Sequence, residues 1–150
     1  MFKSGLALAL AGLLTMNPAA LWVASDPPGA TVYVGAGGIP FFPCGTAFAA
    51  TQNGSALTGF FRFTPGTAGC SAVPPIALTS GSVNPLTHPS TVTWTSDTFA
   101  FAFLPGSLVI PNLSVRFTGT TNAAGNSVTG AFQTLQEGVV VVTSSLTFTK

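Results

Sequence analysis

Residues 113–149 read LSVRFTGTTNAAGNSVTGAFQTLQEGVVVVTSSLTFT, and this stretch decides the fold class. Apolar and polar side chains alternate along 113–119 and 128–134, and Leu146 and Phe148 alternate with threonine in the run 139–149, with the period of two that is typical of β-strands. Polar segments rich in Gly and Asn separate the three runs and indicate turns. The simplest arrangement for residues 91–150 is therefore a meander of adjacent antiparallel strands.

The same pattern continues toward the N-terminus. Further strand-like runs occupy residues 30–34, 46–52, 55–63, 91–95, 98–104 and 108–110. The dipeptide Asn53-Gly54 predicts a hairpin, because a type I′ turn needs positive φ at both central residues. A second hairpin is predicted around Ser96-Asp97.

The stretch 71–89 interrupts this pattern. It contains the four prolines Pro74, Pro75, Pro85 and Pro89. Proline cannot donate a ladder hydrogen bond, so we expect a long loop here with at most an edge strand at 76–79.

No window after residue 25 favours a helix, because Gly, Pro and β-branched residues interrupt each one. The prediction is an all-β chain of eight or nine short antiparallel strands. This number of strands, with turns every 8 to 12 residues, is typical of a β-sandwich or of an up-and-down or jelly-roll-like barrel. Residues 26–150 are expected to form a single domain.

The first 25 residues have the layout of a secretory signal peptide. Lys3 precedes the apolar run 5–14, a breaker at Asn17-Pro18 follows, and small residues end at Ser25. Cleavage after Ser25 is the first choice and cleavage after Ala20 the second. An uncleaved anchor and an apolar arm lent to a neighbouring subunit are the alternatives. As a signal peptide, the segment would contact a membrane only transiently.

Two cysteines, Cys44 and Cys70, bracket the Asn53-Gly54 hairpin. An even number of cysteines in an exported chain predicts a disulfide, and no CxxC spacing favours redox chemistry. Together with the N-terminal layout, this predicts an extracytoplasmic location, whether secreted, periplasmic or at the cell surface.

Charge is scarce in this chain. Four basic and three acidic residues make up 5% of it, against about 25% in a typical globular protein. The basic residues form no cluster, which argues against a nucleic-acid partner. A net charge of +1 provides little repulsion between copies, so we expect self-association or binding to other surface proteins.

Groups for catalysis are equally scarce. His88 is the single histidine, which excludes a multi-histidine metal site. With Asp97 and Ser80, Ser82 or Ser90 it could form a hydrolase triad on paper, but no G-x-S-x-G motif accompanies them. We therefore expect no catalytic residues, no metal site and no cofactor, and predict that the protein is not an enzyme.

The chain has thirteen phenylalanines, and most should be core residues. The adjacent pairs Phe41-Phe42 and Phe60-Phe61 break the alternation, so one ring of each pair must point away from its neighbour. Those rings and Trp94 are candidates for a subunit interface or a site for an apolar ligand.

These features predict a structural or interaction subunit of a surface, fibre or virion-type assembly. The alternative is a secreted β-barrel that binds an apolar small molecule or lipid, which the excess of phenylalanine favours.

Overall fold

The computed structural model describes residues 29–37, 39, 44–64, 70, 72–84, 89–102 and 108–150. The predicted N-terminal segment, residues 1–25, lies outside them. The strands are β1 (Thr31–Ala36), β2 (Gly45–Asn53), β3 (Ala56–Thr64), β4 (Ile76–Val83), β5 (Thr91–Ser96), β6 (Phe99–Ala102), β7 (Val109–Thr121), β8 (Ser127–Gln136) and β9 (Val139–Thr149). In these ranges, no helix is long and apolar enough to cross a membrane.

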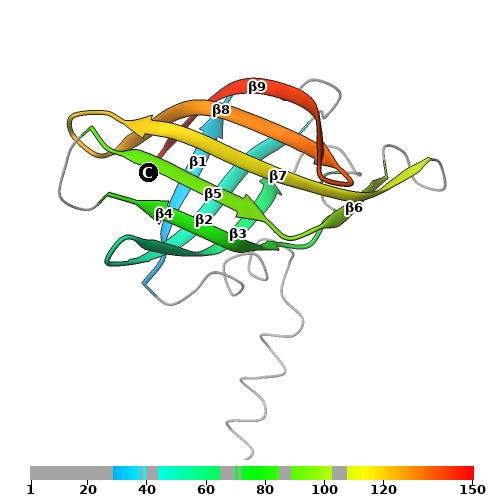
Figure 1. Cartoon of the computed structure of the whole chain (residues 1–150), viewed down its shortest axis with the longest axis horizontal. Coiled ribbons are helices and arrows are strands. Elements are labelled where there is room, and N and C mark those ends of the chain that lie inside the picture. The colour runs from blue at the N-terminus through cyan, green and yellow to red at the C-terminus, as the bar shows by residue number, and fades with distance from the viewer. Residues whose placement is uncertain are drawn as a thin grey trace, which may run out of the picture.

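The strands form one antiparallel sheet that closes on itself (Figure 1). The order is β5-β4-β3-β2-β1-β9-β8-β7-β6, and an additional pairing of β5 with β7 closes eight strands into a barrel. The all-β prediction is confirmed, and of the predicted architectures the structure has the up-and-down barrel. A sandwich is excluded because the eight barrel strands each pair with two neighbours in a single sheet.

The predicted hairpin around Ser96-Asp97 is wrong. β5 pairs with the second half of β7 and β6 with the first half, both antiparallel to it, so the chain continues in one direction through the break. At this point the Ser96 hydroxyl accepts a hydrogen bond from the Val115 amide (3.0 Å), while the Asp97 amide turns to the Ala77 carbonyl of β4 (2.7 Å). The backbone ladder between β5 and β7 is interrupted here, and the Ser96 hydroxyl serves as the acceptor for the Val115 amide in place of a backbone carbonyl.

The expectation of at most an edge strand at 76–79 is also wrong. β4 runs over Ile76–Val83 and pairs with β3 on one side and β5 on the other. Pro74, Pro75, Pro85 and Pro89 lie on either side of this strand in the sequence, so none removes a donor from its ladder.

The runs expected at 108–110 and 113–119 form the single strand β7. Its pairing with β6 shifts register between Phe99↔Leu113 and Phe101↔Ile110. The extra residues include Asn112, which has a positive φ of 57°. A bulge therefore absorbs Pro111 without ending the strand.

Aromatic side chains fill the middle of the barrel. Six strands each contribute one fully buried ring to this central layer: Phe48, Phe61, Trp94, Phe117, Phe132 and Phe148. The register explains this layer, because Phe48 lies opposite Phe61, and Phe117 opposite both Trp94 and Phe132. Ring centroids lie 5.0 to 6.2 Å apart in tilted, stacked and edge-on pairs, which are favourable geometries for aromatic contacts.

One end of the barrel is closed. Phe63 packs edge-on against Phe99 and Phe101 there. Beyond them Cys44, just before β2, forms the predicted disulfide with Cys70, in the connection between β3 and β4, and both are buried. The bond therefore ties two connections together across this end.

The disulfide is expected to contribute about 3 kcal/mol to the free energy of unfolding, because it closes a loop with a sequence separation of 26. Cys44→Ala/Cys70→Ala should lower the urea midpoint accordingly, measured by intrinsic fluorescence. Reduced wild-type protein serves as the control and should show the same loss. An unchanged midpoint in both samples would contradict this role.

Candidate functional site

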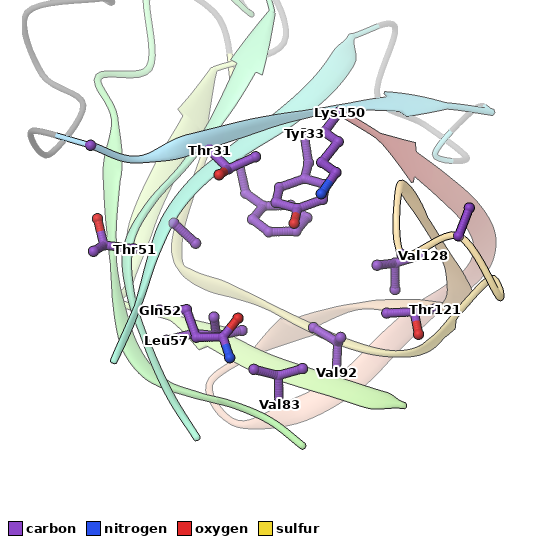
Figure 2. Close-up of a pocket in the computed structure, with 15 residues that line it drawn as sticks. Thr31, Tyr33, Thr51, Gln52, Leu57, Val83, Val92, Thr121, Val128 and Lys150 are labelled. Atoms are coloured by element: carbon purple, nitrogen blue, oxygen red, sulfur yellow. The ribbon is translucent and has the colours of Figure 1, made fainter. Parts of the chain in front are cut away.

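The opposite end of the barrel is open and holds a cavity of about 440 Å³ (Figure 2). It lies where β1, β3, β5 and β8 begin and where β2, β4, β7 and β9 end. The lining consists of Gly29, Thr31, Tyr33, Phe48, Ala50, Thr51, Gln52, Leu57, Val83, Val92, Thr121, Ala124, Gly125, Val128 and Lys150. This volume is within the range of small-molecule sites, which is roughly 300–1,000 Å³.

The cavity exists because side chains become smaller toward this end. Residues two positions apart on a strand lie on the same face, and the residue two positions toward the open end has a smaller side chain than the aromatic residue of the central layer. This decrease in side-chain size occurs on five strands: from Phe48 to Ala50 on β2, from Phe61 to Gly59 and Leu57 on β3, from Trp94 to Val92 on β5, from Phe117 to Gly119 and Thr121 on β7, and from Phe132 to Gly130 and Val128 on β8. The barrel diameter is set by its eight strands, so the missing side-chain volume remains as open space.

Two stacked rings form the floor of the cavity. Tyr33 and Phe48 are opposite each other on β1 and β2, with ring centroids 4.7 Å apart and an angle of 11° between the ring planes. Phe48 also contacts Trp94 and Phe148 in the aromatic layer. Burial raises the pKa of the half-buried Tyr33 phenol, so it is neutral at pH 7.

The walls combine aliphatic and polar groups, and polar atoms make up most of the surface that they expose. Leu57, Val83, Val92 and Val128 point into the open space in Figure 2, whereas Thr51 points away from it. Val92 and Val128 are buried, and Leu57 and Val83 are half-buried. An apolar molecule that enters would displace water from aliphatic surface on several sides.

Backbone contacts fix the rim between β5 and β7. The Ser90 amide donates to the Thr121 hydroxyl (2.8 Å) and the Thr121 amide donates to the Ser90 carbonyl (2.9 Å). Both residues are buried, so this pair holds the barrel closed beside the cavity.

Lys150 is held at the rim by the turn between β7 and β8. Its amide donates to the Asn126 carbonyl (3.1 Å). The Asn122 side chain accepts hydrogen bonds from the amides of Asn126 (3.0 Å) and Ser127 (3.3 Å), which holds this turn in place. In Figure 2 the Lys150 side chain extends from the end of β9 into the opening.

The candidate residues from the sequence lie elsewhere. Phe61 and Trp94 are buried in the aromatic layer, and neither lines the cavity. Phe60 is half-buried next to the inward Phe61, so this pair does divide its rings between two faces. Phe41 and Phe42 lie outside the described residues.

The described polar candidates do not line the cavity either. His88 lies outside the described residues. Asp97 follows β5 at the closed end, and Ser82 bonds to the Thr93 hydroxyl (2.9 Å). The structure therefore brings none of the described triad candidates to the cavity lining, although Ser90 contacts its rim.

The sequence analysis missed the residues that line the cavity. The signal that could have found them is the change from aromatic to small residues at one end of several strands, such as Phe48 to Ala50 and Trp94 to Val92. This signal requires knowing which ends of different strands meet, and therefore the register. Comparison of the chain with family models, curated proteins and solved structures gives no match.

Tyr33 is the single tyrosine of the chain, so its titration can be followed directly by phenolate absorbance. We expect a midpoint above the ordinary value of about 10, because burial disfavours the phenolate. The Tyr33 phenol of the unfolded chain deprotonates at a lower pH than that of the folded protein. The free energy of unfolding should therefore fall as pH rises above about 10. Tyr33→Phe should remove that part of the pH dependence. A midpoint at or below 10 would contradict the burial of this ring.

Proposed function

We propose that the protein is a non-enzymatic β-barrel module that binds a small apolar molecule at its open end. The observation that carries this proposal is the cavity of about 440 Å³, with an aromatic floor and with aliphatic as well as polar side chains in its walls, at one end of a barrel whose middle is filled by aromatic rings. Binding there needs no opening of the core, because the aromatic layer below the cavity is already packed.

The chemistry of the lining supports binding over catalysis. The described lining residues include no His, Cys, Asp or Glu, which are the usual groups for acid–base or nucleophilic chemistry. The polar groups present are hydroxyls, one amide and one ammonium, which can orient a ligand by hydrogen bonds.

An extracytoplasmic location is part of this proposal. The disulfide between Cys44 and Cys70 fits an oxidising environment. The signal-peptide layout of residues 1–25 supports the same location.

Filling the cavity should abolish binding. Wild-type protein is expected to bind the neutral fluorophore N-phenylnaphthylamine with a dissociation constant of order 100 micromolar or tighter, as expected for a ligand of this size. Val83→Trp places a large ring in the cavity and should weaken binding at least tenfold, measured by fluorescence titration.

The matched control is Val34→Trp, which adds the same ring at a side chain that is 54% exposed and outside the cavity lining. It should leave the affinity unchanged. Equal affinity in wild type and Val83→Trp, or no binding by wild type, would overturn the proposed function.

We propose self-assembly as a second candidate function, because exposed apolar side chains gather at the closed end. Of six exposed large hydrophobic residues in the described ranges, five lie at or beside the starts of β7 and β9: Leu108, Val109, Val139, Val140 and Val141. Grouped apolar side chains on a surface indicate a contact site. With little net charge to oppose it, a second copy of this chain is the expected partner.

Charge placed at this end should prevent association. Wild-type protein is expected to form dimers or larger species as its concentration rises in sedimentation velocity, and Val139→Lys should shift these to monomer. Thr58→Lys, an exposed position near the open end, adds the same charge and should not. A wild type that stays monomeric at all concentrations would refute this second candidate.

A further inference from the structure

The charges of the barrel are divided between its ends. The described charged residues are Arg62, Asp97, Arg116, Glu137 and Lys150. Lys150 is the one among them that lines the cavity. Both described carboxylate side chains lie at the opposite end, where Asp97 follows β5 and Glu137 lies in the turn between β8 and β9.

The two arginines do not reach the cavity. Arg116 is exposed on β7 between the inward Val115 and Phe117, and its guanidinium donates two hydrogen bonds to Gln133 (2.9 and 2.8 Å). Arg62 lies between the buried Phe61 and Phe63, so it too points outward. Among the described side chains, the ammonium of Lys150 is therefore the one charged group at the open end.

This charge lies next to apolar surface. Figure 2 shows the Lys150 side chain entering the opening on the side of Tyr33, with Val92 and Val128 on the facing walls. An ammonium beside aromatic and aliphatic side chains attracts an anion more strongly than it does in open water, because the surrounding protein lowers the local dielectric constant.

We propose that the ligand is an amphiphilic organic anion. Its apolar body lies on the stacked Tyr33 and Phe48 rings between the aliphatic walls, and its anionic group accepts a hydrogen bond from the Lys150 ammonium. This inference rests on the proposed binding function and adds to it the charge and orientation of the ligand. The anionic group faces the rim, and the apolar body enters first.

Two fluorophores with the same ring system test the inference. N-phenylnaphthylamine is neutral, and anilinonaphthalenesulfonate carries one sulfonate on the same skeleton. Wild-type protein at low salt should bind the sulfonate about three- to tenfold more tightly than the neutral compound, which is the range of a partly exposed charge-assisted contact. Raising the salt concentration should reduce this preference, because it screens exposed charges.

Lys150→Met removes the charge and retains a long apolar side chain. It should lower the affinity for the sulfonate by the same three- to tenfold and leave the neutral compound unchanged. Arg116→Met is the matched control, because it removes an equal charge from the outer face. It should retain the preference of the wild type for the sulfonate.

The outcomes separate this inference from the function on which it rests. If both compounds bind with equal affinity and Val83→Trp abolishes both, the cavity binds apolar molecules and the anion inference is wrong. If neither compound binds wild-type protein, the proposed function itself fails. A sulfonate preference that persists in Lys150→Met would also overturn the inference, because the anion would then be held elsewhere.

Discussion

The packing of Trp94 with five phenylalanine rings is the contact on which the rest of the structure depends. Trp94 meets Phe48, Phe61, Phe117, Phe132 and Phe148, which come from five other strands. An eight-stranded barrel has an interior just wide enough for side chains to fill. Because these rings fill its middle, the barrel is solid there, and the cavity lies where the rings stop.

The two ends of the barrel differ for the same reason. Toward the closed end, Phe63, Phe99 and Phe101 continue the aromatic filling, and the disulfide ties the connections beyond them. Toward the open end, glycine and aliphatic residues follow the rings, and the barrel ends in a cavity. The proposed binding at one end and the proposed association at the other are therefore compatible, because their residues do not overlap and the packed aromatic layer separates them.

Alternation predicted most of the fold because it reports local burial. The strands 46–52, 55–63, 128–134 and 139–149 were expected within a few residues of their observed bounds. The errors occurred where long-range pairing overrides a local signal. Ser96-Asp97 resembles a turn, but β7 is long enough to pair with β5 and β6 in succession. Similarly, β4 lies between prolines that suggest a loop, and its pairing with two neighbours defines it as an interior strand.

The sequence by itself determined the class of the fold, the presence of a hairpin after β2 and the cysteines available for a disulfide, because each depends on residues near one another or on residue type. The predicted type I′ turn at Asn53-Gly54 is wrong: Asn53 pairs with Ala56, so the central residues are Gly54 and Ser55, and of these only Gly54 has a positive φ (62°). Only the tertiary structure decided that the sheet closes, which ends of the strands meet, and that Tyr33, Val92, Val128 and Lys150 surround one space. Those features depend on the register of strands far apart in the chain. A shift of one residue would turn every inward side chain outward, and the alternation within a single strand is the same in a sandwich and a barrel.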